Sequence, residues 1–201
     1  EQSFGPEHPD VARDLNNLAQ LLQATNRLVE AETLMRRALT IYEQSYGTQH
    51  PNISAALNNL AKLLMVTNRY AEAESLIRRA LTIDEQSYSV EHSHVARDLN
   101  ILATLLKYTD RPVEAELLIR RSLALEVLSR GADHPYVATD LQFLASLLES
   151  TNRLAEAEPL MRRALSIDEK AYGGEHPTIA TDLNNLALLL KDTNRGWRPS
   201  H

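Results

Sequence analysis

The sequence predicts an all-α protein built from repeated, antiparallel helix pairs that stack into a solenoid. A short motif, Leu-Asn-Asn-Leu-Ala, starts at residues 15, 57 and 183, and looser copies start at 99 and 141. Neighbouring copies are 42 residues apart, and a period between about 20 and 50 residues is typical of a repeat architecture. Within each repeat, apolar residues follow the period of an α-helix.

Composition is consistent with folded repeats and argues against some classes of partner. The 201 residues are 43% hydrophobic and 24% charged, which are ordinary values for a globular protein. The net charge of −6 argues against a general nucleic-acid binder, which needs a basic face. The sequence has no cysteine and no apolar run near the roughly 18 residues of a membrane span. We therefore expect no nucleic-acid or membrane partner. The lack of cysteine leaves the redox compartment open and is compatible with a cytoplasmic location, which we expect.

The first helix of each repeat, called helix A, is expected from about Pro9 to Gln23 in the first complete repeat. Proline suits the first position of a helix, where a missing N–H loses no hydrogen bond, and it recurs at residues 51, 135 and 177. One face of this helix is apolar and carries Val11, Leu15, Leu18, Ala19 and Leu22.

A short turn and a second helix, helix B, are expected next. Thr-Asn-Arg or Thr-Asp-Arg recurs from residues 25, 67, 109, 151 and 193, and Asn or Asp tolerates the left-handed conformation that closes a helix. Helix B runs to about Tyr46 in the first repeat. Its apolar face carries Ala31, Leu34, Met35, Ala38, Leu39 and Ile41.

The repeats predict one array over residues 1–195. We expect repeat units at about 9–50, 51–92, 93–134 and 135–176, a half repeat at 177–195, the tail of a preceding repeat at 1–8, and a C-terminal tail at 196–201. The fifth helix A lacks a helix B of its own, so apolar surface should stay open there. Concentration-dependent self-association through this end, or easy fraying of it, is therefore expected.

Six features match in order and spacing the consensus of the tetratricopeptide repeat (TPR): Leu18-Ala19, Leu22, the turn at Asn26, Ala31, Met35 and Ala38. The 42-residue step, the His-Pro entry and the Asn-Asn-Leu-Ala box resemble the longer variant found in kinesin light chains and their bacterial relatives. This resemblance implies a right-handed TPR superhelix of four full repeats plus one terminal A helix. It also implies that the A helices line a concave groove that binds peptide segments.

Two ladders of residues invite a chemical interpretation. The histidines at 8, 50, 92, 134 and 176 cannot share a metal ion, because a helix diameter of about 10 Å separates successive copies and ligands lie about 2 Å from the metal. A role in the turns between repeats is expected instead. The arginine pairs that start at 36, 78, 120 and 162 suggest phosphate binding, but a glutamate four residues earlier favours local ion pairs.

No motif of an enzyme, cofactor site or metal centre is present in the sequence. We therefore expect a non-catalytic protein with no cofactor.

A second stripe on helix A is the strongest functional signal. In the first repeat it carries Arg13, Asn16, Gln20, Gln23 and Ala24, and the resemblance implies that it faces the groove. The amides at the position of Asn16 can donate to and accept from the backbone of an extended peptide. The alternative is that these amides bond to groups in the neighbouring repeat.

The stripe also predicts the charge of the ligand. It carries Arg13, Lys62, Arg97, Lys107 and Lys191 against Glu149 and Asp192, which favours an acidic segment or a C-terminal carboxylate. The alternative function is a structural spacer or a self-assembling segment without a specific ligand. The predicted peptide-binding residues are Arg13, Asn16, Gln20, Asn58, Lys62, Met65, Arg97, Asn100, Lys107, Tyr108, Gln142 and Asn184.

Overall fold

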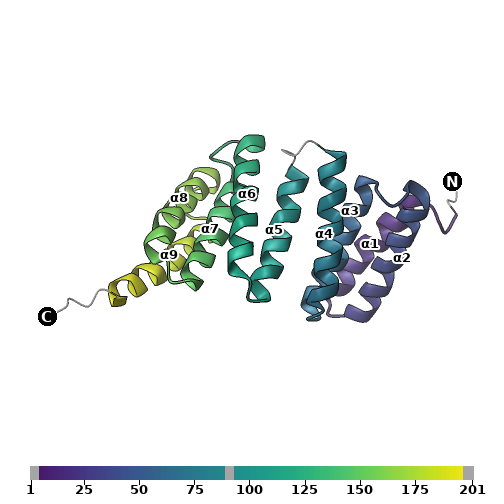
Figure 1. Ribbon diagram of the computed structural model, residues 1–201, viewed down its shortest axis with the longest axis horizontal. Helices are drawn as coiled ribbons and strands as arrows, with labels where there is room; N and C mark the ends of the chain where they lie inside the picture. Colours follow the sequence, from purple (N-terminus) through teal and green to yellow (C-terminus); the bar gives the residue numbers. More distant parts are fainter. Residues whose placement is uncertain (1–4, 89–92, 197–201) are drawn as a thin grey trace. The chain divides into compact units, whose positions relative to one another are not determined.

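The computed structural model describes residues 5–88 and 93–196, with side chains up to residue 193. In this part of the chain all regular structure is helical (Figure 1). The helices are α1 (Pro9–Ala24), α2 (Leu28–Tyr46), α3 (Pro51–Val66), α4 (Tyr70–Ser87), α5 (Ser93–Tyr108), α6 (Pro112–Arg130), α7 (Pro135–Ser150), α8 (Leu154–Tyr172) and α9 (Pro177–Gly196). Across the described residues, no helix has the length and apolar character needed to cross a membrane.

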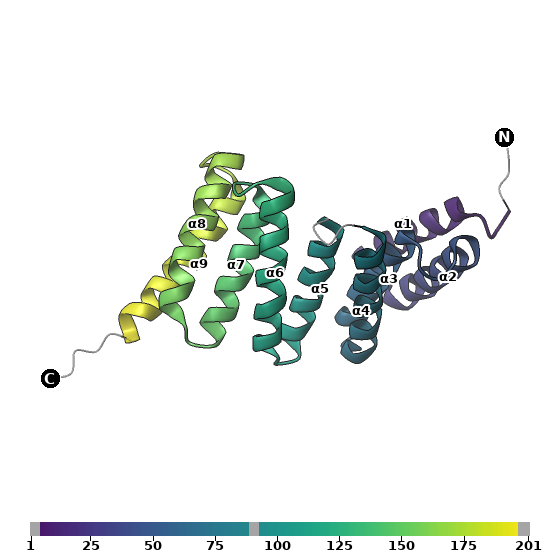
Figure 2. The same cartoon turned by 45° about the horizontal axis from the view of Figure 1, so that its top comes forward.

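The chain divides into two compact units, Glu1–Val90 and Glu91–His201. In the first unit α1 pairs with α2, α3 pairs with α4, and α2 packs on α3. In the second unit α5 pairs with α6 and α7 with α8, while α6 packs on α7 and α8 on α9. Figures 1 and 2 show that the helices of each pair run side by side in opposite directions. The helix-pair prediction is confirmed within each unit.

Histidine caps the start of most A helices. The Nδ1 atoms of His8, His50 and His134 each accept a hydrogen bond of 3.2 Å from the backbone N–H two residues later, and His176 accepts one of 3.3 Å. Such bonds satisfy a donor that the first turn of a helix leaves without a partner. These contacts confirm the predicted role in the turns, while His92 lies outside the described residues.

The turns within the repeats depend on a left-handed residue. Asn26, Asn68, Asp110 and Asn152 have φ values of 61°, 59°, 58° and 60°, as their short polar side chains permit. The fifth turn, expected at 193–195, is wrong, because α9 continues to Gly196.

The core lies between helices of the same and successive repeats. In the first unit, Ile41 of α2, Ile53 and Leu57 of α3 and Ile83 of α4 belong to one buried cluster. Buried alanines such as Ala38 let the helices approach closely. A corresponding cluster in the second unit contains Val137, Ala138, Leu141, Ala164 and Ile167.

The B helices carry the predicted ion pairs, and some of these extend between repeats. The Nε atoms of Arg36, Arg78, Arg120 and Arg162 each lie 2.9 Å from the glutamate four residues earlier, which confirms the local pairing. In addition, Arg69 contacts Glu32, and Arg153 contacts Glu116, each at 2.7 Å and 37 residues apart. These cross-repeat pairs were not predicted from the sequence.

Candidate peptide-binding face

The A-helix face is defined here as the stripe that starts at Arg13 in the first repeat and its equivalents in later repeats. In the first unit α1 and α3 provide this face. Arg13, Gln20 and Lys62 are exposed and Met65 is partly buried. Asn16 and Asn58, in contrast, are only 8% and 2% exposed, so their side chains belong to the interior more than to the surface.

The second unit provides its own A-helix face from α5, α7 and α9. Lys107, Tyr108 and Asn184 are exposed, whereas Arg97, Asn100 and Gln142 are partly buried. The predicted cations therefore divide between the units, with Arg13 and Lys62 in the first and Arg97 and Lys107 in the second.

Neighbouring groups reduce the positive field of some of these cations. Arg13 donates to Asp10 at 2.9 Å and to Asp14 at 3.2 Å, and Arg97 donates to Asp98 at 3.2 Å. The Nζ of Lys107 donates instead to the uncharged Ser146 hydroxyl at 2.9 Å. It also lies 5.5 Å from the centre of the Phe143 ring. The charge of Lys107 thus lies near the surface of α5. The hydrogen bond that its ammonium donates goes to a hydroxyl group and not to a carboxylate.

Two of the predicted ligand-binding amides bond inside the protein. The Nδ2 of Asn100 donates to the carboxylate of Asp140, and to the Ser122 hydroxyl at 3.3 Å. The Nε2 of Gln142 donates to Asp182 at 2.6 Å and to Asp168 at 3.2 Å. Each amide therefore links its own repeat to helix A of the next repeat. These contacts of Asn100 and Gln142 agree with the alternative interpretation, in which the amides bond to groups in the neighbouring repeat.

The carboxylates that receive these bonds are buried and were missed in the sequence. Asp140 and Asp182 are 1% and 5% exposed. Burial raises the pKa of Asp140 to about 6, although the Asn100 amide opposes this. Burial and the charge of Asp168 raise the pKa of Asp182 to about 6. The sequence does contain a pattern that points to these carboxylates, because both stand two residues before the position of the repeated amide.

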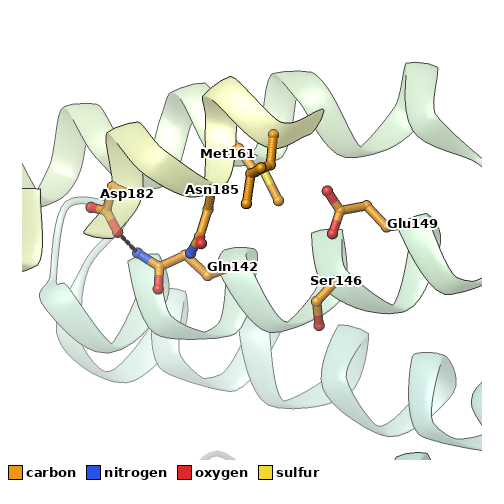
Figure 3. A pocket seen from close by; sticks show the side chains of 7 residues that line it. Gln142, Ser146, Glu149, Met161, Asp182 and Asn185 are labelled. Atoms are coloured by element: carbon orange, nitrogen blue, oxygen red, sulfur yellow. Dashed lines mark hydrogen bonds between the residues drawn. The ribbon is translucent and has the colours of Figure 1, made fainter. Parts of the chain in front are cut away.

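A pocket of about 170 Å³ opens on the A-helix face of the second unit (Figure 3). Gln142, Ser146 and Glu149 of α7 line one side of it. Asp182, Asn185 and Leu188 of α9 line the other, with Met161 of α8 also contributing. Burial raises the pKa of the Glu149 carboxyl, whereas the charge of Lys107 opposes the rise. The pocket combines apolar and hydrogen-bonding groups, as a site for one side chain of a ligand requires.

A larger pocket of about 430 Å³ lies between α5, α6 and α7. Its lining includes Arg97, Arg130, Tyr136 and the buried carboxylates of Glu126 and Asp140. The Nε of Arg130 lies 2.7 Å from Glu126, and its guanidinium carbon lies 4.7 Å from the centre of the Tyr136 ring. Charges of both signs thus line this pocket, and Arg130 and Glu126 pair with each other there.

These features define a helix-pair repeat protein whose A helices present a varied polar face. No group of three or more possible ligand side chains is placed to hold a metal ion in the described part of the chain. A family model for the tetratricopeptide repeat matches residues 1–44, 15–86, 52–126 and 144–195. These matches cover most of the chain, so the protein belongs to the tetratricopeptide repeat family.

Similar solved structures share this fold. One is a kinesin light chain-type protein with nearly identical TPR-like repeats from Podosopora anserina, at 22% identity and a TM-score of 0.81, covering 94% of this chain and 90% of that one. Another is BtubC (BKLC) from P. vanneervenii, at 24% identity and a TM-score of 0.83, covering 92% of this chain and 74% of that one.

A third similar structure is aspartyl phosphate phosphatase F from Bacillus subtilis, at 13% identity and a TM-score of 0.75, covering 90% of this chain and 44% of that one. At these identities the likeness shows the fold alone. No curated protein sequence matches the chain.

Proposed function

We propose that this protein is a non-catalytic scaffold that binds an extended, acidic peptide segment on its A-helix face. TPR proteins are generally protein-interaction scaffolds, and kinesin light chain-like folds are typically non-enzymatic. The observation that supports an acidic ligand most strongly is the position of Lys107. Its ammonium lies at the surface with the exposed ring of Tyr108 next to it in sequence. We further propose that the protein acts in the cytoplasm.

In this proposal the amides of Asn100 and Gln142 do not bind the peptide backbone, although their repeated pattern predicts that role. Because they bond to carboxylates of the next repeat, they shape the face rather than hold the peptide. Exposed Asn184 and Gln20 remain the amides for the peptide backbone. The cation contact in the second unit is assigned to Lys107, whose ammonium donates to a hydroxyl group.

Charge reversal tests this proposal. We expect Lys107→Glu to weaken binding of an acidic peptide by about 1.5–3 kcal/mol, the range for hydrogen bonds to charged groups. Fluorescence anisotropy with acidic, neutral and basic peptide pools would measure this effect. Lys170→Glu is the matched control, because Lys170 is an exposed lysine on helix B that pairs with Asp133. Equal affinity for all pools, or equal loss in both variants, would favour a spacer without a specific ligand.

Self-association through α9 is a second part of the proposal. Leu183 and Leu188 of α9 are 49% and 52% exposed, although Leu57, Leu99 and Leu141, the equivalents of Leu183 in α3, α5 and α7, are fully buried. We expect a concentration-dependent increase in mass by sedimentation, which Leu183→Gln with Leu188→Gln should reduce. A strict monomer at all concentrations, with hydrogen-exchange protection in 177–191 equal to that in α7, would contradict it.

A further inference from the structure

The pocket between α7 and α9 offers a hydrogen-bond acceptor where an amide lines it. The Nε2 group of Gln142 already donates to Asp182 at 2.6 Å and to Asp168 at 3.2 Å, and Figure 3 shows the first of these bonds. Both hydrogens of an amide NH₂ are used by two such bonds. Only the carbonyl oxygen of Gln142 is therefore left for a ligand, and it can only accept.

The other polar groups of α7 in this pocket are acceptors as well. The Ser146 hydroxyl donates its hydrogen to the backbone carbonyl of Phe143 at 2.8 Å and accepts from Lys107. An ionised Glu149 carboxylate has no hydrogen to donate. Asn185 of α9 also lines the pocket and can accept through its carbonyl oxygen. A ligand group that complements this lining therefore has to be a donor.

Negative charge predominates around the pocket. Asp168 and Asp182 are 3% and 5% exposed, and the Oδ2 of Asp182 accepts no hydrogen bond from the described residues. Burial raises the pKa of the Glu149 carboxyl, Lys107 opposes the rise, and the charge of Asp192 adds to it. The described residues that line the pocket include no lysine and no arginine. A bound cation would supply the positive charge that these carboxylates favour.

The acidic residue at Glu149 is not a requirement of the repeat. At its position the other A helices carry Gln23, Met65, Lys107 and Lys191. All of these helices form and pair in the same way. Packing of the repeats therefore does not account for a carboxylate at this position, and the carboxylate is available to a ligand.

The size of the pocket and its apolar part indicate what carries the donor. Met161 and Leu188 provide apolar surface. The volume of about 170 Å³ is below the roughly 300–1,000 Å³ of sites that enclose a whole small molecule, so a single side chain fits. Lysine and arginine combine an aliphatic stem with several N–H donors and no acceptor.

We propose that the pocket between α7 and α9 binds a lysine or arginine side chain of the peptide ligand, close in sequence to the acidic residue that contacts Lys107. Ser146 both lines the pocket and accepts from Lys107, so the two contacts adjoin. An extended chain advances about 3.3 Å per residue, which places the basic residue within about three residues of the acidic one. This inference rests on the proposed function, because the same peptide provides both residues.

The test uses the full chain at concentrations where sedimentation shows a monomer, and three pools of labelled peptides. All peptides contain one glutamate, and a second position within three residues on either side is basic in the first pool, methionine in the second and glutamate in the third. We expect the basic pool to bind about tenfold more tightly than the methionine pool, the effect of one charged hydrogen bond. The glutamate pool should bind most weakly in fluorescence anisotropy.

Two substitutions should reduce this preference to about threefold or less. Glu149→Gln removes a charge from the pocket, and Leu188→Lys places a cation beside it, at the position that Lys62 occupies in α3. Leu188 is 52% exposed, so the fold tolerates this change, and circular dichroism checks both variants. Glu169→Gln is the matched control, because Glu169 is an exposed glutamate of α8 outside the pocket lining. It should leave the preference unchanged.

The results separate this inference from the proposed function. Equal binding of the basic and methionine pools, or tightest binding of the glutamate pool, would overturn the inference and leave the acidic-peptide proposal standing. Absence of binding by every pool would overturn both. An equal loss of preference in Glu149→Gln and Glu169→Gln would mean that net charge alone attracts the basic residue, which would also overturn the assignment of the pocket.

Discussion

Replacing Asp140 with asparagine should stabilise the second unit at pH 7.5 and reduce the pH dependence of its unfolding. Asp140 is buried on α7, and its pKa is about 6 in the folded protein against an ordinary value of 3.8. The folded state therefore binds more protons than the unfolded state between these two values. Stability consequently rises as the pH falls from about 7.5 towards 4, and it is lowest where Asp140 is ionised.

The size of this effect follows from the shift in pKa. Two pKa units correspond to about 3 kcal/mol at roughly 1.4 kcal/mol per unit. We expect a smaller gain, about 1–2 kcal/mol, for Asp140→Asn, because the hydrogen bond from Asn100 would no longer be charge-assisted. The new NH₂ group would also need a partner at the buried Oδ2 position, which accepts no hydrogen bond in the described residues.

Urea unfolding at several pH values between 5 and 8 would measure this effect. Within this range the ion-paired glutamates Glu32, Glu72 and Glu116, whose arginine partners hold their pKa values below the ordinary range, stay ionised. Asp133→Asn is the control, because Asp133 is an exposed aspartate. A wild-type stability that is constant from pH 8 to 5, or a less stable Asp140→Asn variant at pH 7.5, would contradict the prediction.

The helix pairs could be predicted from the sequence because they depend on local patterns that recur. The spacing of apolar residues, the proline after histidine and the Asn or Asp in each turn act within a few residues of where they stand. Their effects are visible at His50, which caps α3, and at Asn68, which closes it. The turn predicted at 193–195 was wrong, since α9 continues to Gly196.

The site was harder to predict because burial depends on what the neighbouring repeats supply. Asn58 and Asn184 occupy the same position of the repeat. Nevertheless, Asn58 is buried on α3, which α4 covers, whereas Asn184 is exposed on α9 at the end of the described residues. A periodic pattern places both residues on one stripe, but it does not say whether a stripe faces a carboxylate or solvent. The buried partners of Asn100 and Gln142 became evident only from the packing between repeats.

The same dependence on neighbours predicts opposite outcomes for two equivalent leucines. Leu141 of α7 is fully buried and packs with Val137 and Ile167 in the core of the second unit. Leu183 stands at the same repeat position of α9 and is 49% exposed. We expect Leu141→Ala to reduce the free energy of unfolding by about 2–5 kcal/mol, because it removes buried contacts and leaves a cavity. Leu183→Ala should cost less than about 1 kcal/mol, since its side chain gives up little buried area.

The two variants are matched controls for each other, because the residue type, the substitution and the position in helix A are identical. Urea unfolding of each full-length variant gives the free energies, and hydrogen exchange shows where protection is lost. We expect Leu141→Ala to lower protection in α7 and α8, and Leu183→Ala to affect only α9, since each repeat contacts its neighbours alone. Equal destabilisation by the two substitutions would mean that another helix covers α9 in solution. The self-association proposal predicts such a contact at high protein concentration. Repeating the comparison at low concentration, where α9 should be uncovered, would then have to restore the difference.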